Sequence, residues 1–224
     1  MRRGENAMNA DELHPAEKPS VRVKELSERD RRRLLKHFLA LDDGDRLLRF
    51  GSVLPDDLIT GYVQRLDFSR DTVFGVYNSK LALVGVGHLA FLPREDVPAV
   101  SDATVKSRAA EFGVSVSASA RGLGIGSRLF ERAAIHCRNE DVDTLYMHCL
   151  SSNQTMMHIA RKAGMEIHRE YGEADAFLKL PPADPRSVLR EAVEEQVAAF
   201  DYRLKANAKA AVKWWKRLPR FRGK

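Results

Sequence analysis

This sequence lacks the residue patterns that would predict a disulfide framework, a zinc site or a membrane-spanning helix. Its 224 residues include only two cysteines, Cys137 and Cys149, too few and too badly spaced for a disulfide framework or a zinc site. We expect both to be small buried residues, and we expect no metal site. Apolar runs such as 81–86 are far shorter than the roughly 20 residues that span a bilayer. No apolar segment follows the basic start Met1-Arg2-Arg3, so we expect no secretion signal and a cytoplasmic protein.

Acidic residues are also missing from the C-terminal segment 202–224, which carries nine Lys and Arg. The whole chain has a net charge of +6, so residues 1–201 are net acidic. The excess of basic residues therefore describes a tail and gives no reason to expect a nucleic-acid-binding fold or a nucleic-acid partner.

The chain divides into three parts. Residues 1–19 are polar and show no periodicity, so we expect them to be disordered, and Met8 is an alternative start to Met1. Prolines at 181, 182 and 185 mark a boundary, which leaves a folded domain at 20–181 and a C-terminal segment at 182–224. A domain of this length can bury a core without covalent staples.

Hydrophobic periodicity predicts an α/β domain. Strands are expected at 21–26, 71–77, 81–92, 110–118, 144–149, 166–171 and 174–180, and helices at 27–41 (starting with a capping box at 27–30), 55–66, 129–137 and 153–164. This order argues for a mixed central sheet with helices on both faces. We expect loops at 46–50 and 93–106, and Ser151 or Ser152 as the cap of the helix that begins at Asn153. Glycines in the second and third strands predict bulges or a close backbone approach.

A glycine-rich turn, Arg121-Gly-Leu-Gly-Ile-Gly126, separates the strand 110–118 from the helix after it. Such a turn leaves unpaired N–H groups at the positive end of the helix dipole, and glycine lets a phosphate approach the backbone. Ser127-Arg128 follows the last glycine, whereas a Walker A loop needs Lys and Ser/Thr there, and the glycine spacing differs from a dinucleotide fingerprint. We predict a phosphate-bearing ligand. A turn that binds nothing is the alternative, with a Rossmann site as a minor one.

Arg121, Gly124 and Gly126 form Arg-x-x-Gly-x-Gly, and in this motif the sequence resembles the GNAT superfamily of N-acetyltransferases. In that family the amides of the turn hold the coenzyme A pyrophosphate, and the preceding strand pairs with the pantetheine arm. Residues 153–165 look like the family's Asn-x-x-(Ala/Met)-x-x-(Leu/Ile)-x-x-Lys-x-Gly-(Phe/Met) segment, which carries a cofactor-contacting helix. The resemblance covers about 21–180 and implies a GNAT-like mixed sheet, with the C-terminal helix as an addition.

The resemblance implies acetyl-CoA as co-substrate and direct transfer of its acetyl group to a primary amine. The cofactor-binding positions that it implies are Val114, Ser115, Val116, Arg121, Gly122, Leu123, Gly124, Ile125, Gly126, Ser127 and Asn153. Glu111 is the candidate general base, because GNAT proteins often carry a glutamate on this strand; the alternative is an edge carboxylate in water. Arg49, Phe50 and His88 are acceptor-side candidates. Their alternatives are a solvated loop pinned by Phe50 and a histidine that is simply packed and hydrogen-bonded.

One position departs from the family pattern. Many GNAT enzymes place a tyrosine as general acid seven residues after the asparagine, where this chain has Ala160. The hydroxyl then comes from Ser151, Ser152 or Tyr171, or the thiolate leaves by way of water. This departure leaves open a second function, a non-catalytic acyl-CoA-binding regulatory module. The basic C-terminal helix leaves open a third, an interaction protein that acts through that helix. The acceptor is a small amine, an amino acid or a protein lysine.

Beyond the proline boundary, apolar residues recur every three or four positions: Leu189, Val193, Val197, Phe200, Leu204, Ala208, Ala211 and Trp215. This spacing predicts one long amphipathic helix, which ends at Trp214-Trp215 and a basic tail. Such a helix can dock on the domain, pair with a second subunit in a homodimer, or make a weak membrane contact through its basic tail.

Overall fold

The computed structural model of the chain describes residues 21–92 and 108–215. The predicted disordered start (1–19) and the predicted loop (93–106) lie outside these residues, and so do the last nine residues of the basic tail. In order along the chain, the elements are β1 (Lys24–Glu25), η1 (Glu28–Asp30), α1 (Arg31–Leu39), α2 (Asp43–Phe50), α3 (Asp56–Arg65), β2 (Thr72–Tyr77), β3 (Leu83–Phe91), β4 (Ala109–Val116), η3 (Ala118–Ala120), α4 (Ile125–Asn139), β5 (Thr144–Leu150), α5 (Gln154–Lys162), β6 (Glu166–Glu170), β7 (Glu173–Lys179) and α6 (Pro185–Trp215).

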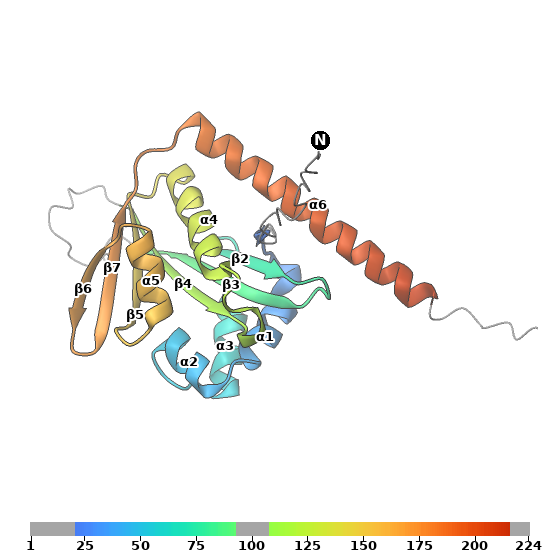
Figure 1. Ribbon diagram of the computed structural model, residues 1–224, viewed down its shortest axis with the longest axis horizontal. Helices are drawn as coiled ribbons and strands as arrows, with labels where there is room; N and C mark the ends of the chain where they lie inside the picture. The colour runs from blue at the N-terminus through green and yellow to red at the C-terminus, as the bar shows by residue number, and fades with distance from the viewer. Residues whose placement is uncertain (1–20, 93–107, 216–224) are drawn as a thin grey trace, which may run out of the picture.

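Seven strands form one sheet in the order β1-β2-β3-β4-β5-β7-β6. Neighbouring strands are antiparallel except β4 and β5, which are parallel and are joined through α4. The helices α4 and α5 cover one face of the sheet, and α1 and α3 pack on the other (Figure 1). The predicted mixed sheet with helices on both faces is confirmed.

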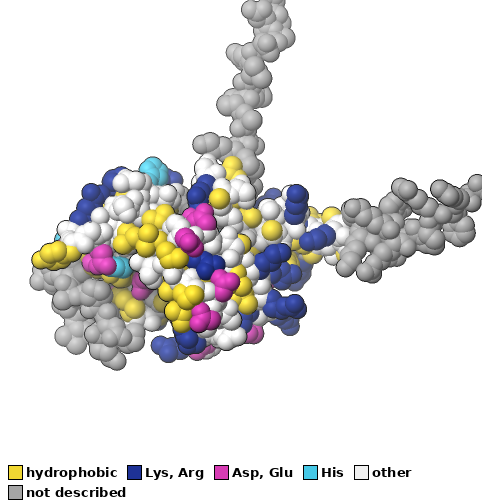
Figure 2. All heavy atoms as spheres, turned by 90° about the horizontal axis from the view of Figure 1, so that it is seen from below, with side chains coloured by type: hydrophobic (Ala, Val, Ile, Leu, Met, Phe, Trp, Pro, Cys, Tyr) yellow, Lys and Arg dark blue, Asp and Glu magenta, His cyan; other side chains and the backbone are white. Residues whose placement is uncertain are grey.

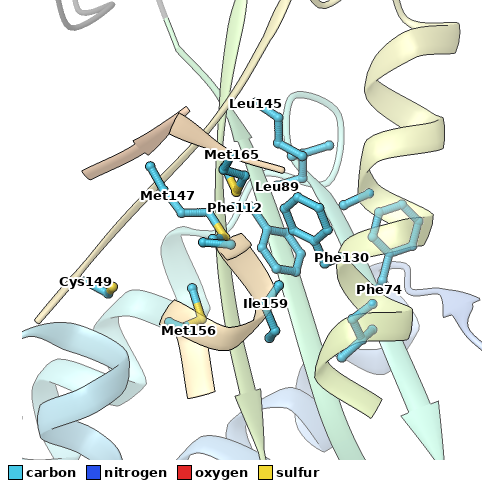
Figure 3. Close-up of a cluster of buried hydrophobic side chains, with 14 of the residues drawn as sticks. Phe74, Leu89, Phe112, Phe130, Leu145, Met147, Cys149, Met156, Ile159 and Met165 are labelled. Atoms are coloured by element: carbon cyan, nitrogen blue, oxygen red, sulfur yellow. The ribbon is translucent and has the colours of Figure 1, made fainter. Parts of the chain in front are cut away.

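The alternation that predicts β4 also decides what lies on each face of it. Ala110 and Phe112 are buried under α4, and Phe112 meets the ring of Phe130 edge-on at 5.5 Å between centroids (Figure 3). Glu111, Gly113 and Ser115 have the opposite direction, because successive residues of a strand face opposite sides. Their face of the sheet carries α1, α2 and α3.

The expected close backbone approach is found at Gly85 in β3. A Cβ atom there would lie 2.5 Å from Cγ2 of Ile125, the first residue of α4. The start of α4 therefore rests directly on the backbone of β3, which fixes where the glycine-rich turn lies relative to the sheet.

Two sequence predictions, one for residues 46–50 and one for the cap of α5, are wrong. Residues 46–50, predicted as a loop, belong to α2, because the Asp42 carboxylate accepts a hydrogen bond from Asp45 N (2.8 Å) and starts a new helix. The helix ends at Gly51, whose φ of +75° suits a left-handed cap. Neither Ser151 nor Ser152 caps α5; Asn153 does, with its Oδ1 accepting from Met156 N at 3.1 Å.

The predicted C-terminal helix is α6, which runs along α4 and the β1 edge and continues past the sheet (Figure 1). Among the residues that the structure describes, no helix combines the length and the apolar character needed to cross a membrane.

Candidate functional site

The centre of the sheet opens where β4 and β5 separate. These parallel strands pair only over three positions, Ala109–Glu111 with Thr144–Tyr146. Beyond Glu111, β4 continues to Val116 and β5 to Leu150 without pairing to each other. The β5-facing N–H and C=O groups on this part of β4 are therefore available to a ligand. The predicted pantetheine contacts Val114, Ser115 and Val116 all lie on this part of the strand.

A cavity of about 470 Å³ lies beside the gap, between α2, β4 and β5. It brings together three residues that the sequence predicts separately, Arg49 and Phe50 from α2 and Glu111 from β4, and Val114 lines it too. Seen from below the view of Figure 1, hydrophobic side chains lie in patches between charged ones (Figure 2). The exposed apolar side chains Leu47, Leu48 and Leu58 belong to α2 and α3 on this side of the sheet.

The glycine-rich turn joins η3 to the start of α4, past the end of β4. Gly122 and Gly124 have φ of +76° and +74°, and a Cβ on either would meet nothing within 4 Å. The N-terminus of α4 has no side-chain cap, so its first N–H groups remain available to an anion at the positive end of the helix dipole. Leu123 is 54% exposed, and the side chain of Arg121 forms an ion pair with Asp45 of α2.

Arg49 closes the α2 side of the cavity. Its guanidinium lies 5.1 Å from the ring centre of Phe50 and 5.7 Å from that of Tyr62, and it donates a 3.0 Å hydrogen bond to Tyr62 Oη. A Cβ on Gly113 would lie only 2.8 Å from the guanidinium carbon, so glycine here leaves the space that the guanidinium occupies. Within the described residues no carboxylate comes within 4 Å of Arg49. A cation held on aromatic faces without a counter-ion suits an anionic group.

His88, the third acceptor-side candidate, does not line the cavity. Its Nδ1 is 3.0 Å from Tyr62 Oη, and its Nε2 is 3.2 Å from Asp71 Oδ2. Because Arg49 can only donate, Tyr62 Oη accepts from Arg49 and its O–H can point to His88. His88 therefore holds the hydroxyl of Tyr62 in place, and through it the guanidinium of Arg49.

Ser115 contacts a buried histidine on the sheet face away from α4. Its Oγ lies 2.8 Å from His37 Nε2, and His37 Nδ1 lies 3.1 Å from the carbonyl oxygen of Leu83. A carbonyl only accepts, so Nδ1 carries the hydrogen and Nε2 accepts from the serine. Burial lowers the pKa of His37 to about 4, because it disfavours the charged imidazolium. This neutral histidine links to α1 the end of β4 that is not paired with β5.

Sequence reasoning missed a second polar group at the cavity, centred on His148 of β5. His148 lines the cavity, and its Nδ1 is 2.7 Å from Asp175 Oδ1 on β7. Tyr146 Oη donates to the same oxygen at 2.7 Å. Burial alone would raise the pKa of Asp175, but hydrogen bonds from His148 and Tyr146 outweigh it and hold that pKa below its usual value. Because Glu111 is the parallel partner of Tyr146, these groups share one face of the sheet.

The hydroxyl candidates are not at this cavity. Tyr171 is 97% exposed in the β6–β7 turn, and neither Ser151 nor Ser152 lines the cavity. Ala160, at the position where the family often has tyrosine, is fully buried in the core. Cys149 does line the cavity, and burial raises the pKa of its thiol to about 11, so it stays protonated near neutral pH. Its predicted burial is confirmed, as is that of Cys137.

Asn153 holds the cavity wall together. Besides capping α5, it donates from Nδ2 to the carbonyl oxygen of Leu48 at 3.3 Å and is almost fully buried. Both ends of its amide are therefore engaged within the protein, and it links α5 to α2.

Comparison with known proteins points in one direction. A family model described as "Acetyltransferase (GNAT) family" matches residues 6–165. No curated protein matches the chain in sequence. The GNAT domain of PAT from S. lividans shares 20% identity at a TM-score of 0.57, covering 70% of this chain and 89% of that one. A ribosomal-protein-alanine N-acetyltransferase from Brucella melitensis shares 16% at 0.51, covering 70% and 99%. A phosphinothricin acetyltransferase from Sinorhizobium meliloti, in complex with acetyl-CoA, shares 12% at 0.54, covering 74% and 94%.

Proposed function

Because this chain belongs to the GNAT acetyltransferase family, we propose that it binds acetyl-CoA and moves the acetyl group directly to a primary amine. The observation that carries this proposal is the gap between β4 and β5, which has an uncapped, glycine-rich helix start past its end and a cavity beside it. The pantetheine arm would pair with Val114, Ser115 and Val116. The pyrophosphate would lie on the N–H groups of 121–127, with Asn153 keeping α5 in place behind it.

The experiment that tests the cofactor site is a calorimetric titration of the wild-type protein and a Gly124→Trp variant with acetyl-CoA. The indole would occupy the open space in which the phosphates are expected, so we expect binding to weaken at least tenfold. Gly164→Trp is the matched control, because Gly164 has a similar φ of +71° and equally open surroundings but follows the C-cap of α5. Unchanged binding in Gly124→Trp would refute the site, and no binding to folded wild-type protein would refute the function.

An acceptor that arrives as an ammonium loses two protons from its nitrogen: one passes to a base and then to solvent, and the other ends on the leaving thiolate. The amine nitrogen forms a bond to the thioester carbon, the carbon–sulfur bond breaks, and its electrons stay on sulfur. An amine with a pKa of about 10.4 is almost wholly protonated at neutral pH, so a base beside it lowers the barrier. Glu111 is our candidate base. His148, oriented by Asp175, is our candidate for returning a proton to sulfur.

The two roles are separable by kinetics. We expect Glu111→Gln to lower kcat by about 10²–10⁴-fold and to remove the acidic limb of the pH–rate profile. His148→Gln should instead change the alkaline limb. Both variants should keep acetyl-CoA affinity, since neither residue lies on the turn. A Glu111→Gln enzyme with an unaltered rate and pH profile would leave Glu111 as an edge carboxylate.

Two other functions remain tied to particular observations. Ala160 in place of tyrosine motivates a non-catalytic acyl-CoA-binding regulatory module, which predicts tight binding and no turnover on any amine. The basic helix end motivates an interaction protein, which predicts that deletion of 202–224 abolishes function and leaves the domain folded. We also propose that the protein is cytoplasmic.

A further inference from the structure

The helix α6 docks on the domain through its charged side. Each of its four acidic residues pairs with a basic residue of the protein: Glu191 with Arg132 (2.5 Å) and His136 (2.7 Å), Glu194 with Arg128 (2.8 Å), Glu195 with Arg132 (3.6 Å), and Asp201 with Arg22 (2.6 Å). The Arg132 side chain is only 1% exposed. Beside these pairs Ala198 is buried, and the partly buried ring of Tyr202 packs on the domain with its centroid 4.9 Å from that of Tyr77.

The apolar side of α6 is consequently turned away from the domain. Five of its residues, which we call the outer stripe, are about half exposed or more: Leu189 (65%), Val193 (52%), Val197 (46%), Phe200 (63%) and Leu204 (52%). Figure 1 shows α6 on the outside of the domain and continuing beyond the sheet. Apolar side chains in a continuous row on a helix surface usually mark an interaction site.

The outer stripe is narrow. It has one apolar residue per helical turn, at steps of four, four, three and four residues. At about 100° per residue, Gln196 and Arg203 border it on one side and Arg190 and Glu194 on the other, and Asn207, in line with Leu189, follows its C-terminal end. A narrow seam between polar borders is the pattern of helix-to-helix packing. A helix that lies in a membrane interface has a broader apolar face.

We propose that the outer stripe binds the outer stripe of a second copy of this chain, with the two α6 helices antiparallel. The stripe is matched to itself in that direction: Leu189 and Leu204 are equally far from the point between residues 196 and 197, and so are Val193 and Phe200. Leu189 of one copy then meets Leu204 of the other. Because each domain lies on the opposite side of its own helix, only the two helices come into contact.

Charge decides the direction of the pair. The half of α6 at 185–201 holds all four acids and two arginines, whereas 202–224 holds nine basic residues and no acid. A parallel pair would bring both basic ends together, which is unfavourable between like charges. In the antiparallel pair the basic ends lie far apart, because the shared stretch 185–208 is about 36 Å long at ~1.5 Å per residue.

The first test is the molar mass in solution, measured by light scattering from micromolar to millimolar concentrations. We expect the wild-type protein to be a dimer and Val197→Glu to be a monomer with unchanged circular dichroism, because the substitution puts a charge in the middle of the stripe. Leu58→Glu is the matched control and should stay dimeric, since Leu58 is 50% exposed on α3, away from α6. A wild-type protein that is monomeric throughout would overturn the proposal.

The second test measures the direction with Leu189→Cys and Leu204→Cys proteins under mild oxidation. A mixture of the two should form a disulfide-linked pair, and neither protein alone should do so, because each residue meets its counterpart only from the other copy. The native cysteines are buried and should not interfere. Self-linking of each protein alone would mean parallel helices. Binding of monomers to vesicles that contain anionic phosphatidylglycerol, lost in Val197→Glu, would assign the stripe to a membrane. Either result would overturn the antiparallel dimer, and none of these readouts depends on acetyl-CoA.

Discussion

Mild acid should destabilise this protein through His37. The side chain is 3% exposed and is neutral in the folded state, with its two ring nitrogens hydrogen-bonded to Leu83 and Ser115. Burial, with a smaller contribution from the nearby charge of Arg49, lowers its pKa from 6.5 to about 4. In the unfolded chain the same imidazole regains an ordinary pKa near 6.5.

The sign and size follow from proton linkage. As the pH falls below about 6.5, the unfolded state binds a proton that the folded state refuses, so the free energy of unfolding decreases. The loss continues until the pH reaches the folded pKa of about 4. At roughly 1.4 kcal/mol per pKa unit, the full loss is about 3.5 kcal/mol, and at pH 4.5 it is roughly 2.5 kcal/mol. Since domains are typically stable by only ~5–15 kcal/mol, this is a large share.

The assay is urea unfolding of the wild-type protein and His37→Gln at pH 7 and pH 4.5. At pH 7 the variant should be the less stable of the two, because it loses buried contacts. At pH 4.5 the difference should shrink by about 2.5 kcal/mol, because only the wild type has a buried imidazole to protonate. His158→Gln, at an exposed position of α5, should show no such change. A difference for His37→Gln that is the same at both pH values would refute the reasoning.

Two further predictions concern arginines. Arg132→Met leaves Glu191 without its closest basic partner, so the docking of α6 should weaken by about 3 kcal/mol, and hydrogen exchange in 185–208 should become faster. The control Arg203→Met, on the exposed side of α6, should leave exchange unchanged. Equal protection in both variants would contradict the docking role of Arg132. Arg49, with no carboxylate partner among the described residues, should favour acceptors that carry an anionic group near the amine. We expect Arg49→Lys to raise KM for an α-amino acid at least tenfold and to leave KM for the matching decarboxylated amine unchanged, and equal effects on both would argue against that role.

Local patterns predict much of the fold because burial on one face leaves a period in the sequence. The alternation around Phe112 places β4, and the glycine-rich turn places the start of α4. The same logic fails at 42–50. There, three aspartates and a glycine look like a break between helices, whereas the Asp42 carboxylate caps α2. A turn signal and a helix start use the same short polar residues, so spacing alone does not separate them.

The site is predictable only as far as its residues share a strand or a motif. Glu111 and Val114 lie on the predicted strand beside the motif, and both line the cavity. The pair of His148 and Asp175 depends on the register of β5 against β7, which is set by contacts 27 residues apart in sequence. Nothing local to either residue specifies that register, so the pair becomes visible only in the folded structure.

The C-terminal helix shows most clearly what a sequence pattern leaves open. The spacing of Leu189, Val193 and Val197 predicts that they share one side of a helix, and they do. It does not predict which side faces the domain. That choice depends on α4, where Arg128, Arg132 and His136 follow one another at steps of four and form a basic row. The acids of α6 meet this row in the reverse order, so these ion pairs, together with Ala198 and the ring of Tyr202, dock the helix. An apolar stripe that docking leaves uncovered is then the best reason to look for a second copy of the chain.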